Sequence, residues 1–205
     1  MWSNRAREIW SRVPPGTVDE LGAAAWRLRT VRTPRQGAAA LDDEIAHLFE
    51  RIAPVLIEHP LPIRSKRAAL ATVALAAGSA AALDEIEAIS LLVPGTHVVS
   101  APSVPLAIGA SFLALATEAY VAMSLRVHML HDGGYMVEPA LVAREVLNAM
   151  TGHDDVVITR AATQALTGRV LRRWARGIVP IVGIGFATVD AQKTIRAIAA
   201  MPFRV

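Results

Sequence analysis

The chain contains no cysteine among its 205 residues. This absence excludes disulfide scaffolds, thiolate metal sites and cysteine nucleophiles. Aromatic residues are also scarce, at 5%, whereas hydrophobic residues make up 53% and alanine supplies much of that share. Alanine has the highest helix propensity and little preference for strands. The composition therefore favours closely packed helices, and it is typical of GC-rich bacterial coding.

Long uncharged apolar runs are missing as well, although a membrane-spanning helix needs about 20 apolar residues. Residues 106–125 have the length but include Glu118, and a carboxylate at mid-bilayer costs roughly 2.5–3.5 kcal/mol. Ala68–Leu83 is only weakly apolar, and Gly177–Val189 is too short. We expect these stretches to be buried helices of a bundle, with a bilayer span by residues 106–125 as the alternative.

Signals for export and for common reactions are absent too. Met1–Arg12 is charged and has no apolar run, so no secretory signal is expected. The expected location is the cytoplasm, or a peripheral or integral position at the inner membrane face. No Gly-x-Ser-x-Gly elbow occurs, and Phe186 follows Gly185 where a Walker loop requires lysine. The sequence therefore predicts a non-enzymatic protein without a cofactor.

Hydrophobic spacing predicts an all-α bundle of seven or eight helices. A short helix is expected at Ser3–Val13, and a Thr17–Glu20 capping box predicts a second helix that ends near Arg32. Apolar residues spaced by three and four over Leu41–Leu56 predict an amphipathic helix with a bend at Pro54, and His59-Pro60-Leu61-Pro62 predicts its end.

The rest of the chain supplies the expected core. We expect an amino-terminal helical segment, residues 1–62, to pack on a helical domain, residues 63–205, as one structural unit. A helix is expected to begin at Glu138–Pro139, and a basic helix capped by Asp154 or Asp155 to run to Arg176. The predicted core helices are Ala68–Leu83, Leu106–Leu130 and Ile181–Met201, and Asp132-Gly133-Gly134 predicts the end of the second.

Charge is unevenly distributed, although the net charge is only +3. Residues 156–205 carry eight basic side chains and one acidic side chain, whereas residues 1–155 carry 13 basic and 17 acidic ones. A basic end on a mildly acidic body predicts an anionic partner.

Four arginines are expected on one face of the basic helix because they lie at i, i+3, i+4 and i+7: Arg169, Arg172, Arg173 and Arg176. With Trp174 among them, they suit the headgroup level of an anionic leaflet, where each cation contributes roughly 1 kcal/mol. We expect them to contact the membrane, followed by a tight hairpin at Gly177, Pro180 and Gly183. A solvated face, or ion pairs with the acidic amino-terminal half, are the alternatives. Nucleic acid is disfavoured because aromatic interleaving is absent.

A metal site is a further alternative. His128 and His131 lie one helical turn apart, downstream of Glu118, and histidine with carboxylate suits zinc, iron or manganese. The spacing matches no established metalloprotease motif, and histidines at helix ends also interact with terminal carbonyls. Glu118 is more simply expected in an ion pair with Arg126 or Arg144, or at a polar cavity.

Several features of the carboxyl-terminal half occur in a recognisable order: the helix around Leu115–Tyr120, the Gly134–Tyr135 turn, a helix ending at Gly152, the Arg172–Arg173 stretch followed by Ile178–Gly183, and the helix Thr194–Ala200. In these features residues 66–200 resemble the EcsC family and, distantly, the helical apolar domain appended to some bacterial GTPases. The chain differs from the family at Asp190, where asparagine is usual, and in the Gly-Tyr order of the turn. The resemblance implies a membrane-associated helical protein, linked to transport and secretion operons, without an established catalytic site.

The leading hypothesis is therefore a non-enzymatic membrane-associated accessory or regulatory protein, linked to transport or secretion. Its expected partner is an anionic membrane surface or a membrane protein complex. The alternatives are a soluble homo-oligomeric helical scaffold and a metal-dependent enzyme that uses Glu118, His128 and His131.

Overall fold

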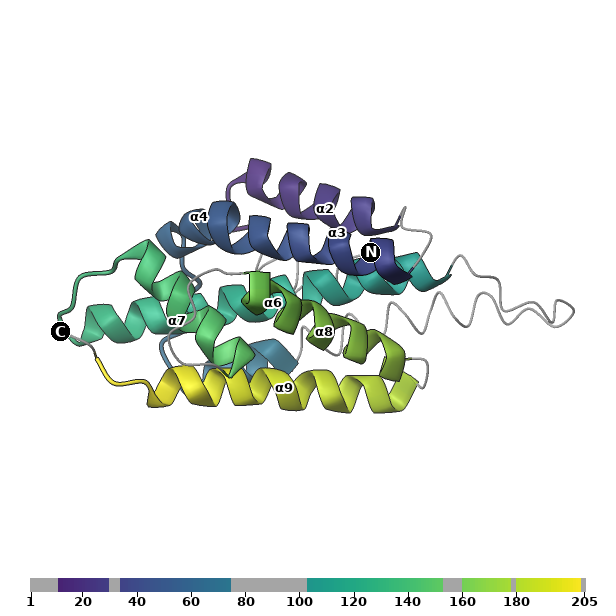
Figure 1. Cartoon of the computed structure of the whole chain (residues 1–205). Coiled ribbons are helices and arrows are strands. Elements are labelled where there is room, and N and C mark those ends of the chain that lie inside the picture. The colour runs from purple at the N-terminus through teal and green to yellow at the C-terminus, as the bar shows by residue number, and fades with distance from the viewer. Residues whose placement is uncertain (1–10, 30–33, 75–102, 153–159, 178–179, 204–205) are drawn as a thin grey trace, which may run out of the picture.

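The computed structural model describes residues 11–29, 34–74, 103–152, 160–177 and 180–203, which form an all-α bundle without strands, as predicted (Figure 1). A π-helical turn, η1 (Leu48–Ile52), joins two of the helices, and residues 66–74 are helical as well. Of the helix expected at Ser3–Val13, residues 3–10 lie outside the described residues, and residues 11–13 form a turn and a bend, so the prediction is wrong for that part. The Ala-rich helix past residue 74 and the cap at Asp154 or Asp155 also lie outside the described residues. The α-helices with defined bounds are α2 (Pro15–Arg29), α3 (Pro34–His47), α4 (Ala53–Glu58), α6 (Ser103–Asp132), α7 (Pro139–Thr151), α8 (Arg160–Gly177) and α9 (Pro180–Ala200).

The central helix of the bundle is α6, which packs against α2, α4, α7, α8 and α9. Every residue from Leu115 to Val127 is buried, on all sides of the helix. This accounts for the apolar composition of residues 106–125, because a helix that is apolar all round must be covered all round. In the described parts of the chain, no helix combines the length and the apolarity needed to cross a bilayer.

A glycine turn ends α6 where Asp132-Gly133-Gly134 predicted its end. Gly134 has a φ of 75°, a left-handed conformation that favours glycine. The amide of Tyr135 donates to the Leu130 carbonyl at 2.9 Å, and the amide of Gly134 donates to the His131 carbonyl at 3.0 Å. These bonds satisfy carbonyl groups that would otherwise be left without partners at the helix end.

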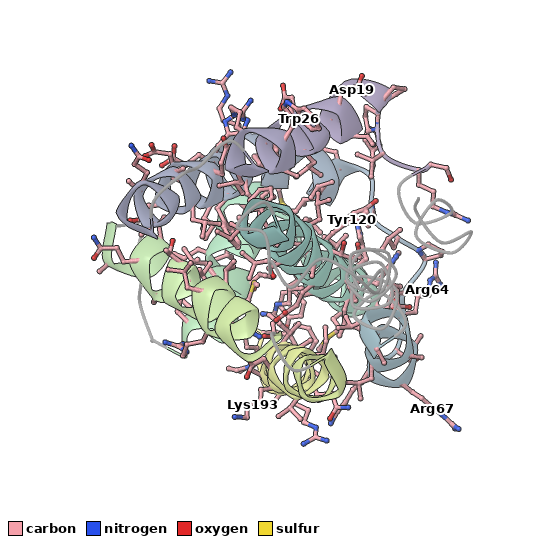
Figure 2. All side chains as sticks on the ribbon, turned by 90° about the vertical axis from the view of Figure 1, so that its right-hand side faces the viewer. Asp19, Trp26, Arg64, Arg67, Tyr120 and Lys193 are labelled. Carbon is pink, nitrogen blue, oxygen red and sulfur yellow. The ribbon has the colours of Figure 1, made fainter. Side chains whose placement is uncertain are left out.

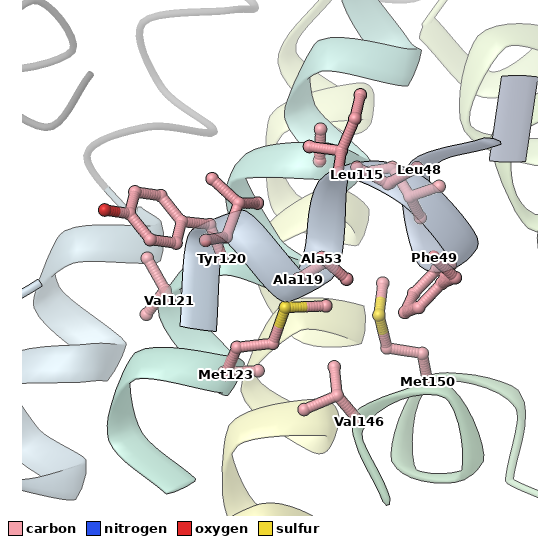
Figure 3. Packing of buried hydrophobic residues seen from close by; sticks show 14 of the residues in the cluster. Leu48, Phe49, Ala53, Leu115, Ala119, Tyr120, Val121, Met123, Val146 and Met150 are labelled. Carbon is pink, nitrogen blue, oxygen red and sulfur yellow. The ribbon is translucent and has the colours of Figure 1, made fainter. Parts of the chain in front are cut away.

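The buried core joins residues from both ends of the chain. Figure 3 shows Phe49 of η1, Met123 of α6 and Met150 of α7 converging beside Val146. The two thioether side chains are flexible and unbranched, so they fill the irregular space between helices that cross at different angles.

Proline is the first residue of four helices, and it shifts one predicted boundary. These residues are Pro15, Pro34, Pro139 and Pro180. Proline suits this position because its φ is fixed near the helical value and no amide hydrogen is needed there. The amide of Thr17 donates to the Pro14 carbonyl at 2.9 Å, so Thr17 lies inside the first turn of α2. The predicted Thr17–Glu20 capping box is therefore wrong.

The disruption expected at Pro54 takes the form of the π-helical turn η1. The amide of Ala53 donates to the Leu48 carbonyl, five residues back instead of four. In a regular α-helix the ring of Pro54 would clash with the Glu50 carbonyl, and the wider turn relieves this clash. After Pro54 the chain forms only the short helix α4, which ends before His59 as predicted.

Neighbouring helices α8 and α9 run antiparallel, with residues 178–179 between them (Figure 1). Gly177 is the last residue of α8 and Pro180 the first of α9. Gly183 lies inside α9, so its predicted part in the hairpin is wrong. The sequence from Pro180 to Ala200 is one helix.

Replacing Gly109 with alanine should destabilise the protein by about 1–3 kcal/mol, the usual cost of overpacking a core. A β-carbon at Gly109 would lie 2.7 Å from the carbonyl oxygen of Ala25, so α2 and α6 would have to move apart. Gly22→Ala on α2 is the matched control, because a β-carbon there meets nothing within 4 Å. Chemical denaturation should give a lower unfolding free energy for Gly109→Ala and an equal or higher one for Gly22→Ala. Equal destabilisation by both substitutions would contradict the close approach of the two helices.

Candidate anion-binding surface

The first of the predicted membrane-contact arginines, Arg169, is a core residue. It is 7% exposed, and its Nη2 donates to Glu118 Oε1 at 2.7 Å. Its Nη1 donates to the Met150 carbonyl at 3.0 Å. Arg169 therefore cannot reach a headgroup, and the prediction is wrong for this residue.

The carboxylate of Glu118 forms the predicted ion pair, but with a different arginine. Arg126 lies eight residues further along the same helix, about 12 Å at 1.5 Å per residue, and points elsewhere. Arg144 is exposed on α7. Arg169 reaches Glu118 because α8 packs directly against α6.

Helix α9 completes this buried polar cluster. The hydroxyl of Thr194 donates to Glu118 Oε1 at 2.6 Å, and Asp190 Oδ2 lies 3.6 Å from Arg169 Nε. The four side chains come from three helices: Glu118, Arg169 and Thr194 are buried, and Asp190 lies at the edge of the cluster with about a third of its side chain exposed. Their chemistry is thus used to hold α6, α8 and α9 together.

A second buried ion pair joins α6 to α7. The guanidinium of Arg126 donates from Nε and Nη2 to the two oxygens of Glu145, at 2.7 and 2.9 Å. Its remaining donors reach the carbonyls of Met201 and Pro202 at 3.3 and 3.1 Å. The ring of Phe203 lies 5.5 Å from the guanidinium carbon. Arg126 therefore fixes the segment that follows α9.

The exposed cations of α8 and α9 include one of the predicted arginines, Arg172, and two residues of α9 that were not part of the prediction. Arg172, Lys193 and Arg196 are exposed, and none forms an ion pair within the described part of the chain. Asp190 is the single acid between residues 160 and 203, and it is turned toward Arg169. Arg173, Trp174 and Arg176 continue α8, but their side chains lie outside those described.

A third group of exposed cations was not predicted, although the sequence contained a signal for it. Arg64, Lys66 and Arg67 are exposed, and they are concentrated in four consecutive residues. Because the charge was summed over residues 1–155, where it is net negative, this local cluster of cations was not identified. The segment from residue 61 to 74 contains no acidic residue.

Exposed acids of the described residues lie on other elements, where both signs of charge are mixed. Those acids are Asp19, Glu20, Asp43, Glu50, Glu58, Asp132 and Glu138. Figure 2 shows Asp19 and Trp26 at one edge of the molecule, and Arg67 and Lys193 at the opposite edge. Arg67 and Lys193, which are far apart in the sequence, thus lie at the same edge of the bundle.

The three residues of the metal-site alternative do not converge. Glu118 is engaged by Arg169, and His128 Nε2 bonds to the Leu61 carbonyl at 2.7 Å. His131 is exposed near the end of α6. Among the described side chains, no group of three histidines or carboxylates is arranged to hold a metal ion.

A polar stripe on α6 anchors the segment that precedes Arg64. The hydroxyl of Tyr120 donates to the His59 carbonyl at 2.5 Å, and the amide of Leu61 donates to Ser124 Oγ at 3.0 Å. His128 completes the stripe, because residues four apart lie on one face of a helix.

Burial raises the pKa of Tyr120 to about 12, while the charge of Arg12 acts in the opposite direction.

Comparisons with known proteins assign no family to the chain. No protein-family model matches the sequence, and searches of characterised proteins and of solved structures return no significant match.

Breaking the Glu118–Arg169 pair from either side should destabilise the protein strongly. Arg169→Met should lower the unfolding free energy by about 3–5 kcal/mol, because it leaves the buried charge of Glu118 without its partner. Glu118→Leu should cost less, because Asp190 stays 3.6 Å from Arg169. The double variant should recover most of this loss, since neither charge remains. Arg172→Met, on the exposed side of α8, should stay within about 0.5 kcal/mol of the wild type. Additive losses in the double-mutant cycle would contradict a direct pair.

Alkaline pH should destabilise the protein through Tyr120. The unfolded chain loses this proton near pH 10, whereas the folded chain keeps it to about pH 12. Stability from this group is therefore intact below pH 10 and falls as the pH rises toward 12. Tyr120→Phe cannot titrate, so its unfolding free energy should fall less over this range than that of the wild type. Parallel pH profiles for the two proteins would rule out a contribution from Tyr120.

Proposed function

We propose that this chain is a non-enzymatic, membrane-associated accessory or regulatory protein, held at an anionic membrane surface by the exposed cations of α8 and α9. The observation that carries the proposal is the composition of this face. Arg172, Lys193 and Arg196 are exposed and form no ion pair within the described residues, while the only acid of the two helices faces inward to Arg169. Such a face has a negative surface as its natural partner.

The pattern of exposure along α9 supports a lipid surface as that partner. Among the described side chains of the helix, the exposed ones are Val189, Lys193, Arg196, Ala197 and Ala200. Val189, Lys193, Arg196 and Ala200 recur at three- and four-residue spacing, and Ala197 lies beside Arg196, so cations and apolar groups share one side of the helix. Long cationic side chains can extend to phosphates while the apolar positions approach the acyl boundary.

Several cations must act together to hold the protein at a membrane, because one cation contributes little affinity. Each contributes roughly 1 kcal/mol near an anionic leaflet, and the attraction fades within a Debye length, about 8 Å at physiological salt. Arg173, Trp174 and Arg176 follow Arg172 in the same helix, and we include them in the proposed contact. The resemblance to the EcsC family agrees with this role and suggests a link to transport or secretion.

Vesicle co-sedimentation tests the proposal directly. The protein should sediment with vesicles of phosphatidylcholine containing phosphatidylglycerol, and should stay in the supernatant with phosphatidylcholine alone. Raising the salt concentration should release it, because screening weakens contacts between exposed charges. Equal binding to both vesicles at every salt concentration, or no binding to either, would exclude the electrostatic role.

A further inference from the structure

We infer that Arg64, Lys66 and Arg67 form a second contact with the same anionic leaflet, so that the protein lies on the membrane along one side of the bundle. This inference rests on the proposed function, because it adds a binding element to the surface formed by α8 and α9. No motif in the sequence marks these three residues, and the inference depends on their position in the fold.

The segment that carries these cations is held in place before it reaches them. Three side chains of α6 bond to the backbone between His59 and Leu61. Ile63 is 6% exposed, so the chain is also fixed by burial immediately before Arg64. Cations on a fixed segment lose less conformational freedom on binding than cations on a free loop.

The helix that follows Arg64 leaves the three cations exposed to solvent. Ser65 Oγ accepts the amide of Ala68 at 3.2 Å, which caps the helix formed by residues 66–74. Ala69 and Val73 of that helix are buried in the core, whereas Arg64, Lys66 and Arg67 are exposed. The helix therefore packs through its apolar face, and none of the three cations pairs with an acid in the described part of the chain.

Position in the molecule brings Arg67 to the same edge as Lys193 of α9, whereas Arg64 lies between the two edges of the bundle. Figure 2 shows Arg67 and Lys193 at one edge, on elements that are far apart in the sequence, and Asp19 and Trp26 at the other. A bilayer is flat on the scale of this bundle, so cations along one edge can meet it together. Two linked contacts bind more tightly than either alone, because the second one forms at high effective concentration.

Charge removal from each element separately tests the inference. The full-length variant Lys66→Gln/Arg67→Gln is compared with Lys193→Gln/Arg196→Gln on α9. Arg51→Gln/Arg144→Gln is the matched control, because it removes the same charge from exposed positions on η1 and α7. All six positions are exposed, and circular dichroism and thermal unfolding verify that each variant folds.

Each of the first two variants should lower the partition coefficient on phosphatidylglycerol vesicles about thirtyfold, or about fivefold per cation. The control variant should stay within about threefold of the wild type if binding depends on where the cations lie and not on net charge alone. If Lys66→Gln/Arg67→Gln binds like the wild type while the α9 variant is impaired, the second contact is wrong and the proposed function stands. A loss as large in the control as in the other variants would reduce the effect to net charge and overturn the inference.

Two further outcomes distinguish the inference from its premise. Absence of wild-type binding to anionic vesicles would remove the proposed function and this inference together. In a parallel titration, a short DNA duplex should bind more weakly than the vesicles at the same salt concentration. Tighter binding of the duplex, lost in both cationic variants, would identify nucleic acid as the partner and overturn the lipid contact.

Discussion

The ion pair between Glu118 and Arg169 is the contact on which the relative positions of α6, α8 and α9 depend. Apolar packing alone is nondirectional and tolerates sliding of one helix along another. Two opposite charges in the core do not, because a shifted register would leave both buried and unpaired at a cost of several kcal/mol. Thr194 and the Met150 carbonyl supply the additional hydrogen bonds that a buried pair requires. The central helix can therefore be apolar on all sides and still occupy one defined position.

Pairing inside the bundle also determines which charges remain outside. Arg169 and Arg172 are three residues apart on α8, so their side chains leave the helix axis in directions about 60° apart. That difference in direction is sufficient to bury one of them and expose the other. Asp190, the one acid of α9, lies 3.6 Å from Arg169, and Lys193 and Arg196 form no ion pair within the described residues. The contact that stabilises the core thus produces the basic surface on which the proposed function rests.

The sequence predicted those parts of the structure that depend on local patterns. Apolar periodicity and helix-ending glycines predicted the helical class, the long helix α6 and its end at Gly134, since these depend on residues close in the chain. Partners across helices could not be predicted in this way. Glu118 was correctly expected in an ion pair, but the choice of Arg169 depends on how α8 packs. Four arginines at helical spacing were assigned to one exposed face for the same reason. Their spacing shows that they share one side of the helix, but it does not show which of them a neighbouring helix covers. The cluster at Arg64 was overlooked because an average over residues 1–155 hid it.

The central claim is that the side carrying the cations of α9 faces the membrane while α2 faces away. Because the chain contains no cysteine, a single introduced cysteine can carry a spin label at a known position. Ala197 on α9 and Ala23 on α2 are both exposed and suit this purpose. On anionic vesicles the label at Ala197→Cys should become less accessible to a water-soluble paramagnetic relaxant, and the label at Ala23→Cys should keep its accessibility. Protection of the label on α2, or no protection of the label on α9 when the protein is bound, would contradict this orientation.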